Sequence, residues 1–165
     1  MRILVCVRRG ADGELSPFEA SAYECALRLG GEVLLLSMGP ADCGEWLSGL
    51  TRLGAAGAYL LSDSAFAGSD TLATVTVLAA AVSRLKPDLI LCGRKTLMGD
   101  TGQVGPGLAA LLHFPLVQEL ISVPTVTENG LRLETRSGVR EAPLPLLVTA
   151  EEISEVRAGG DPMRL

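Results

Sequence analysis

Short apolar runs alternate with longer amphipathic stretches through the first half of the chain. The apolar runs show little polar alternation, a pattern typical of strands that are buried on both faces. Between them, apolar residues recur every three or four positions, which predicts helices with one buried face. The predicted strands are Ile3–Val7, Glu32–Met38, Ala58–Leu61 and Leu89–Cys92, and the predicted helices are Pro17–Leu29, Ala41–Leu53 and a third from its cap Asp70 to Leu85.

The ends of the first predicted helix carry clear sequence signals. Ser16 precedes Pro17, and Glu19 stands three positions after Ser16, as in a capping box whose first helical residue is proline. Gly30 and Gly31 are expected to end this helix, because glycine readily adopts the backbone conformation that follows a helix C-terminus.

The regular alternation of strands and helices predicts an α/β fold. Because each helix connects two neighbouring parallel strands, the expected architecture is a doubly wound, mainly parallel sheet with helices on both faces. A fourth helix is expected over Thr101–Leu112, and β-rich segments follow at Val117–Val126, Leu131–Thr135 and Leu144–Thr149.

The last third of the chain also predicts a β-hairpin. Asn129 and Gly130 stand between two of the β-rich segments, and this dipeptide is a strong hairpin-turn signal. We expect one domain over residues 1–156 and a flexible tail over residues 157–165, which contain two glycines and a proline.

Composition narrows the range of partners. The net charge of −5 argues against nucleic acid, since binding to a phosphate backbone needs clustered Lys and Arg. The longest uncharged apolar stretch, Leu72–Val82, is shorter than the roughly 18 residues needed to cross a bilayer, so no membrane insertion is expected. No secretory signal precedes Arg8 and Arg9, which predicts a cytoplasmic location. The apolar fraction of 48% is compatible with an apolar surface that faces a partner.

Residues that could carry metal or acid–base chemistry are few. His113 is the only histidine, and no CxxC motif is present, so no metal site is expected. His113 follows a predicted helix and is interpreted as a helix-end residue. Glu151 and Glu152 are expected on a solvated surface. The cysteines are Cys6, Cys25, Cys43 and Cys92, and the first and last of these are interpreted as small buried hydrophobes inside strands.

The loop after the fourth predicted strand combines glycines with cations. Ligands of open α/β sheets bind at the carboxyl ends of the strands. Gly99, Gly102 and Gly105 allow backbone amides to approach an anion, and the start of the next helix adds a partial positive charge. Arg94 and Lys95 supply full charges. The stretch matches neither the Walker loop nor the GxGxxG fingerprint, and a glycine-rich connection that only starts a helix would have the same composition.

The same stretch resembles a known family signature. Residues Pro87–Gly93, followed by Gly99–Pro106, resemble the signature of the electron transfer flavoprotein β (small) subunit. The resemblance continues through Arg2–Arg9, Ser16–Glu19, Ser37–Pro40, Gly54–Gly57 and Leu146–Ala150. It implies an adenine-nucleotide-binding, Rossmann-like domain that holds AMP or FAD. The residues Gly99–Pro106 are more similar to those of electron-bifurcating members, and this similarity favours FAD.

The resemblance also implies the nucleotide-binding residues and the function. The implied residues are Cys6, Ser16, Pro17, Phe18, Met38, Gly93, Gly99, Asp100, Thr101, Gly102, Gln103 and Val104, to which its charge adds Arg94. The chain is then expected to be an electron-carrier subunit without catalytic side chains, because the cofactor carries the electrons. Its expected partner is an α-type subunit, in a heterodimer that takes electrons from dehydrogenases, with self-association as the other possibility.

Three departures from the family pattern keep a second hypothesis open. Only Gly10–Leu15 stands where the family has a longer hairpin, Ser16 replaces an Asn, and the sequence ends at Leu165 without the family's C-terminal arm. The missing arm favours a stand-alone adenine-nucleotide-binding module with a regulatory or structural role. A third hypothesis, a nucleotide-hydrolysing or adenylating enzyme, needs a Ser-Gly-Gly-x-Asp-Ser type loop that Arg8–Asp12 does not supply.

Overall fold

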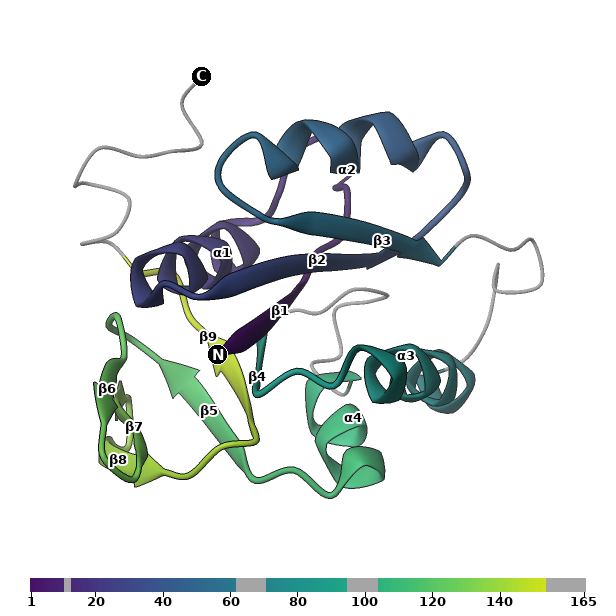
Figure 1. Cartoon of the computed structure of the whole chain (residues 1–165). Helices are drawn as coiled ribbons and strands as arrows, with labels where there is room; N and C mark the ends of the chain where they lie inside the picture. The colour runs from purple at the N-terminus through teal and green to yellow at the C-terminus, as the bar shows by residue number, and fades with distance from the viewer. Residues whose placement is uncertain (11–12, 62–70, 95–103, 154–165) are drawn as a thin grey trace.

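Six parallel strands form the centre of the computed structural model, which describes residues 1–10, 13–61, 71–94 and 104–153 (Figure 1). Within these residues the sheet has nine strands in the order β3-β2-β1-β4-β9-β5-β7-β6, with β8 paired to β7. Neighbouring strands are parallel along the sheet order from β3 through β2, β1, β4 and β9 to β5, and the pairs that involve β7 are antiparallel. The parallel strands are β1 (Arg2–Cys6), β2 (Glu32–Met38), β3 (Gly57–Leu61), β4 (Leu89–Gly93), β5 (Leu116–Leu120) and β9 (Leu146–Ala150).

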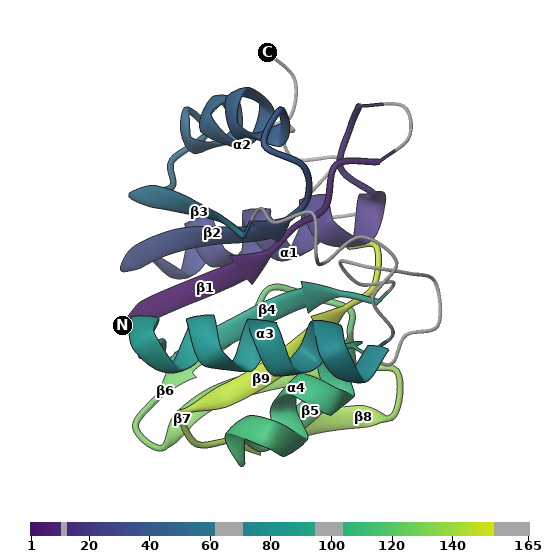
Figure 2. The same ribbon diagram turned by 90° about the vertical axis from the view of Figure 1, so that its right-hand side faces the viewer.

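Four helices cover the two faces of the described sheet. On one face, α1 (Pro17–Leu29) and α2 (Cys43–Thr51) pack on Ile3, Val5 and Leu91. On the other face, α3 (Thr71–Leu85) and α4 (Val104–Leu112) pack on side chains of alternate strand positions such as Leu4 and Ile90, and these two helices lie side by side (Figure 2). The predicted doubly wound α/β fold with helices on both faces is confirmed.

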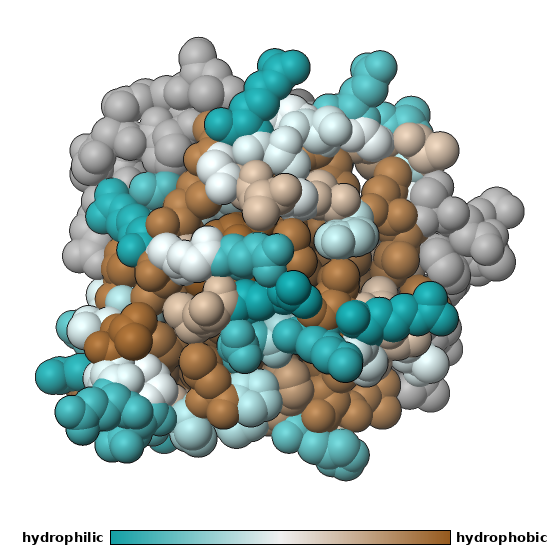
Figure 3. Space-filling model, in the orientation of Figure 1, coloured by the Kyte–Doolittle hydropathy of each residue, from teal (hydrophilic) through white to brown (hydrophobic). Residues whose placement is uncertain are grey.

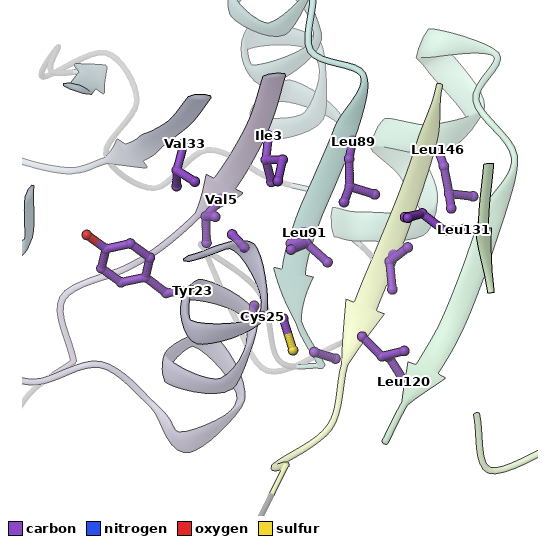
Figure 4. Packing of buried hydrophobic residues seen from close by; sticks show 14 of the residues in the cluster. Ile3, Val5, Tyr23, Cys25, Val33, Leu89, Leu91, Leu120, Leu131 and Leu146 are labelled. Carbon is purple, nitrogen blue, oxygen red and sulfur yellow. The ribbon is translucent and has the colours of Figure 1, made fainter. Parts of the chain in front are cut away.

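Burial explains why the central strands are apolar at every position. All residues of β4 and β9 are buried, because successive side chains of a strand point alternately to the two faces of the sheet and helices cover both faces. Figure 4 shows one of these layers, where Ile3, Val33 and Leu89 of neighbouring strands lie on the same side of the sheet as Tyr23. Strand β3 lies at the edge, and its residues are mostly half-buried.

Helix α1 begins and ends as its sequence signals predict. The Ser16 hydroxyl oxygen accepts a hydrogen bond from the backbone N–H of Glu19 at 3.2 Å, and Gly30 ends the helix with φ 77°. Tyr23 is fully buried on this helix, and its hydroxyl donates to the Leu50 carbonyl at 2.5 Å and accepts from the Ala55 N–H at 3.3 Å. These bonds fix α1 against the end of α2.

The C-terminal third differs most from the sequence prediction. The segment predicted as one unit over Val117–Val126 contains two strands, β5 and β6 (Thr125–Thr127), which pair with opposite ends of β7 (Gly130–Thr135). Strand β8 (Gly138–Ala142) was not predicted, because four of its five residues are exposed and three of the five are polar or glycine. Its pairing with β7 adds a second hairpin at this end of the sheet.

The predicted hairpin turn at Asn129 and Gly130 is shifted by one residue. Residues 128 and 129 form the turn, and Gly130 is the first residue of β7 with φ 139°. A Cβ at Gly130 would overlap the backbone carbonyl of Ala142, so glycine is needed there both for the backbone conformation and for close strand approach.

On the face of the molecule seen in Figure 3, areas of apolar side chains lie between groups of polar side chains. Several large apolar side chains of the C-terminal strands and their flanking residues are exposed, among them Leu116, Ile121, Val126 and Val139. None of the described helices is long and apolar enough to span a membrane. His113 follows the last residue of α4, has φ 59° and donates its backbone N–H to the Ala110 carbonyl at 3.3 Å, in agreement with the predicted helix-end position.

Candidate functional site

The carboxyl ends of β1, β4 and β9 meet at one edge of the parallel sheet. Cys6 of β1 is in register with Cys92 of β4, and Gly93 is in register with Ala150 of β9. The chain leaves the sheet here toward α1 and toward α4. This edge is the position at which open α/β sheets bind ligands.

The first turn of α1 packs directly against the end of β4. A Cβ built at Gly93 would lie 2.9 Å from Cγ of Glu19, 3.0 Å from its backbone nitrogen and 3.0 Å from Cβ of Phe18. Only a residue without a side chain allows this approach. The structure therefore brings together Phe18 and Gly93, which the sequence resemblance had implied as site residues from distant parts of the chain.

Ser16 and Pro17 form the start of the same helix. The Ser16 hydroxyl is engaged as the N-cap, and Pro17 occupies the first helical position, where its missing N–H leaves no hydrogen bond unmade. In the described structure these two residues set the position of the α1 N-terminus. Its partial positive charge faces the junction with β4.

Glu19 carries a carboxyl group beside this junction, and only 3% of the residue is exposed. Burial raises the pKa of Glu19 to about 8, although hydrogen bonds from the Arg8 and Ser16 backbones and the charge of Arg8 act in the opposite direction. The sequence analysis placed Glu19 in the capping box and did not identify it as a site residue. Its only signal was the spacing from Ser16.

Cys6 and Met38 lie beneath the surface at the ends of their strands. Their exposed fractions are 1% and 3%, and both belong to the apolar cluster that also contains Leu36 and Cys92. The hydrogen bond with Cys6, together with burial, raises the pKa of the Cys92 thiol well above its usual value. Cys6 and Cys92 are both buried core side chains, as expected for small buried hydrophobes.

Arg94 leaves the sheet directly after β4. Its backbone N–H donates to the Ala150 carbonyl at 2.9 Å, and its guanidinium lies 3.5 Å from Oε1 of Glu151. The Arg94 side chain is 56% exposed, whereas that of Glu151 is 3% exposed. A second guanidinium, from Arg136 in the β7–β8 turn, lies 3.1 Å from the same carboxylate oxygen.

The expectation of a solvated surface at Glu151 is wrong. The Glu151 backbone N–H donates to the Leu120 carbonyl at 2.9 Å, which continues the pairing of the chain beyond β9 and turns the side chain inward. Glu152, the next residue, is exposed as expected. Neither Glu151 nor Arg136 was identified as a site residue from the sequence, since nothing local marks their contact.

Several implied site residues lie outside the described part of the chain: Gly99, Asp100, Thr101, Gly102 and Gln103. Val104 is the first described residue of α4. Among the described residues, no three His, Cys, Asp or Glu side chains are grouped so that they could hold a metal ion.

A separate hollow lies between β3 and α3. This groove has a volume of about 430 Å³ and is lined mainly by apolar side chains such as Leu36, Leu61 and Val77, with Tyr59 and Arg84 as its polar groups. It is not formed by the junction of Gly93 with α1, and it contains none of the implied nucleotide-binding residues.

Comparison with known proteins identifies the family. A family model described as the electron transfer flavoprotein domain matches residues 3–152, which include every described strand and helix except Arg2, the first residue of β1. The chain belongs to the electron transfer flavoprotein family. The resemblance found in the sequence is thereby confirmed.

Relatives within the electron transfer flavoprotein family are similar over most of this chain. The caffeyl-CoA reductase-Etf complex subunit CarD of Acetobacterium woodii is 36% identical over 95% of this chain and 71% of its own length. Protein FixA of Azorhizobium caulinodans is 39% identical over 93% of this chain and 60% of its own length. The electron transfer flavoprotein subunit beta of Megasphaera elsdenii is 36% identical over 92% of this chain and 62% of its own length.

The chain spans only part of these relatives. It matches 71% of CarD and about three fifths of the FixA and subunit beta relatives. What the electron transfer flavoprotein family shares with this chain is therefore the domain that carries the sheet and the junction of Gly93 with α1.

Proposed function

We propose that this chain is a β-type electron transfer flavoprotein subunit that binds AMP or FAD and works with an α-type subunit to carry electrons from dehydrogenases. The observation that supports it best is the junction at Gly93, where the start of α1 meets the carboxyl ends of β1 and β4 within the family match. The relatives named as subunit beta and FixA support the same function over the stand-alone module.

The residues at this edge fit an adenine nucleotide. Gly93 has no Cβ at the point where the end of β4 approaches α1. The N-terminus of α1 favours a negatively charged group nearby. The exposed guanidinium of Arg94 supplies a full positive charge to a phosphate. Gly99, Asp100, Thr101, Gly102, Gln103 and Val104 complete the proposed site on the basis of the family signature.

A bound flavin would supply the electron transfer itself. The chain's own part is to hold the nucleotide. Glu19 holds a proton at neutral pH because burial raises its pKa to about 8, so this carboxyl group adds no full negative charge beside the proposed phosphate position. The cytoplasmic location remains a prediction from the sequence.

Ligand extraction tests the proposal directly. The purified chain is denatured, and the released small molecules are identified by mass spectrometry, while AMP and FAD are titrated into the ligand-free protein by calorimetry. We expect one of the two nucleotides to be recovered and to bind with a stoichiometry of one. Failure to bind either nucleotide would refute the proposed cofactor site.

Co-expression tests the proposed partner. The tagged chain is produced together with an α-type subunit, and we expect the two to copurify with the absorbance spectrum of bound flavin. Recovery of the chain alone with bound AMP would instead support the stand-alone nucleotide-binding module.

A further inference from the structure

Glu151 is a buried carboxylate at which four segments of the sheet meet. It follows β9, its backbone bonds to the Leu120 carbonyl at the end of β5, and its side chain contacts Arg94 and Arg136. A buried charge is costly unless it is well paired. Here both cations approach the same oxygen, Oε1, and the other oxygen, Oε2, is buried without a hydrogen-bond partner in the described structure.

These two ion pairs of Glu151 are not an efficient way to stabilise the fold. A bidentate pair between one arginine and both carboxylate oxygens would satisfy the buried group better, and an apolar residue of similar size would avoid the cost of burial. The half-satisfied carboxylate is instead suited to holding two guanidiniums near one another. A role in positioning the two arginines explains the arrangement.

The two guanidiniums remain open to a ligand. The Arg94 and Arg136 side chains are 56% and 58% exposed, and each guanidinium has five N–H donors. Within the described residues, Glu151 is the only carboxylate that pairs with either of them. Two cations on one anion leave one net positive charge on this cluster of three side chains.

The turn that carries Arg136 is held in place independently of any ligand. The Thr135 hydroxyl donates to the Gly138 carbonyl at 2.9 Å and accepts from the Ser137 N–H at 3.1 Å, and the Arg136 N–H donates to the Glu119 carbonyl at 3.2 Å. Arg94 is likewise held by its bond to Ala150. Both cations therefore start from fixed backbones, which lowers the entropy cost of binding an anion.

We propose that Arg136 joins Arg94 in binding the phosphate of the nucleotide and that Glu151 is the positioning residue for both guanidiniums. The inference rests on the proposed nucleotide-binding function and extends it to the β7–β8 hairpin. Planar guanidiniums suit a phosphate because each presents two parallel N–H donors to its oxygens.

The test compares two arginines of the same hairpin. Arg136→Gln removes the proposed phosphate ligand, and Arg140→Gln removes the same charge from an exposed position in β8 that carries no ion pair within the described residues. AMP and adenosine are titrated into the full chain by calorimetry, and folding of each variant is checked by circular dichroism. We expect Arg136→Gln to weaken AMP binding roughly tenfold, as for the loss of one charged hydrogen bond, and to leave adenosine binding unchanged.

The control and the conservative variant sharpen this result. Arg140→Gln is expected to change AMP affinity by less than about twofold, since an exposed charge without an ion pair in the described residues is largely screened by salt. Arg136→Lys keeps the positive charge but lacks the two parallel N–H donors of the guanidinium, and it is expected to retain part of the affinity for AMP. If wild-type protein binds AMP and Arg136→Gln binds it equally well, the inference is wrong while the proposed function stands. If wild-type protein binds neither AMP nor FAD, the proposed function itself fails.

Glu151→Gln separates positioning from simple charge. Removing a negative charge near a phosphate would tighten AMP binding if only electrostatic attraction mattered. A positioning role predicts weaker binding instead, and the loss in the double variant Glu151→Gln with Arg136→Gln is expected to be smaller than the sum of the two single losses, because part of the Glu151 effect acts through Arg136. Unchanged or tighter AMP binding in a folded Glu151→Gln variant would overturn the role of Glu151.

Discussion

At the scale of single residues, the close approach of Gly93 to α1 decides how the sheet meets its first helix. Two of the three atoms that a Cβ would meet are the Glu19 backbone nitrogen and Cβ of Phe18, which cannot move without moving the helix. The flexible Glu19 Cγ is the third. Position 93 is therefore restricted by backbone contact and not by side-chain preference.

Gly93→Ala is expected to destabilise the fold by about 1–3 kcal/mol, the usual cost of overpacking, because the first turn of α1 must shift away from β4. The same variant is expected to weaken nucleotide binding. Urea unfolding and calorimetric titration with AMP measure the two effects. Gly49→Ala in α2 is the matched control, since a Cβ there meets nothing within 4 Å, and it is expected to stabilise the protein by up to about 1 kcal/mol. Equal stability of Gly93→Ala and wild type would show that the junction is loose.

Glu19 gives the stability of the protein a specific pH dependence. Burial raises its pKa from the ordinary value of 4.5 to about 8, so between these pH values the folded protein holds a proton that the unfolded chain has released. Stability is therefore expected to fall as pH rises through this window, by at most about 1.4 kcal/mol per pH unit, and to level off above about pH 8.

Glu19→Gln is expected to remove this component of the pH dependence, because the amide does not ionise. The free energy of unfolding measured by urea at several pH values between 5 and 9 compares the variant with wild type. Glu45→Gln, at an exposed position in α2, is the matched control and is expected to leave the slope in place. A wild-type slope that survives in Glu19→Gln would assign the effect to other groups.

At the scale of elements, the two helices on one face of the sheet begin in different ways. The N-cap Ser16 of α1 makes a side-chain hydrogen bond to the first turn, whereas the N-cap Asp42 of α2 makes none. The difference matters for the site, because α1 is the helix whose start faces the end of β4.

Ser16→Ala is expected to cost about 1 kcal/mol of stability, the usual effect of losing an N-cap hydrogen bond. Ser16→Asn restores a capping oxygen and is expected to recover most of this loss. For comparison, Asp42→Ala removes only an exposed 3.6 Å ion pair with Arg9 and is expected to cost less than about 0.5 kcal/mol. Thermal unfolding of the three variants ranks them, and a cost for Asp42→Ala as large as that for Ser16→Ala would contradict the assigned caps.

At the scale of the whole molecule, the proposed site joins segments from both ends of the chain. Strands β1 and β4 form its floor, and β9 and the β7–β8 hairpin contribute Glu151 and Arg136. Ser21 of α1 also accepts a hydrogen bond from the Ile153 backbone at 2.9 Å, across 132 positions of sequence. A ligand bound at this edge therefore contacts elements that become neighbours only in the folded state.

Nucleotide binding is accordingly expected to stabilise the entire described domain. With AMP or FAD at a hundredfold excess over its Kd, the free energy of unfolding should rise by about 2.7 kcal/mol, and the unfolding temperature should rise with ligand concentration. Thermal unfolding with increasing nucleotide measures this linkage, and adenosine at the same concentration reports the part that does not depend on phosphate. An unfolding temperature that is independent of AMP and FAD would argue against a native-state site.

Much of the first half of the fold was predictable from the sequence. The bounds of α1 and β2 agree with the prediction, because caps, glycines and apolar periodicity act over a few neighbouring residues. Helix α2 is shorter than predicted at both ends, and strand β8 was missed, because its exposed and partly charged residues carry no apolar pattern. Pairing with β7 alone makes that segment a strand.

For the candidate site, the sequence by itself determined the family signature, the capping box and the strand ends at which a ligand would bind. Only the tertiary structure decided that Glu19 is a buried acid beside Gly93 and that Glu151 pairs with both Arg94 and Arg136. The physical reason is range. Periodicity and caps depend on hydrogen bonds and side-chain positions within one or two turns, whereas burial and ion pairing depend on which distant segments the sheet order places side by side.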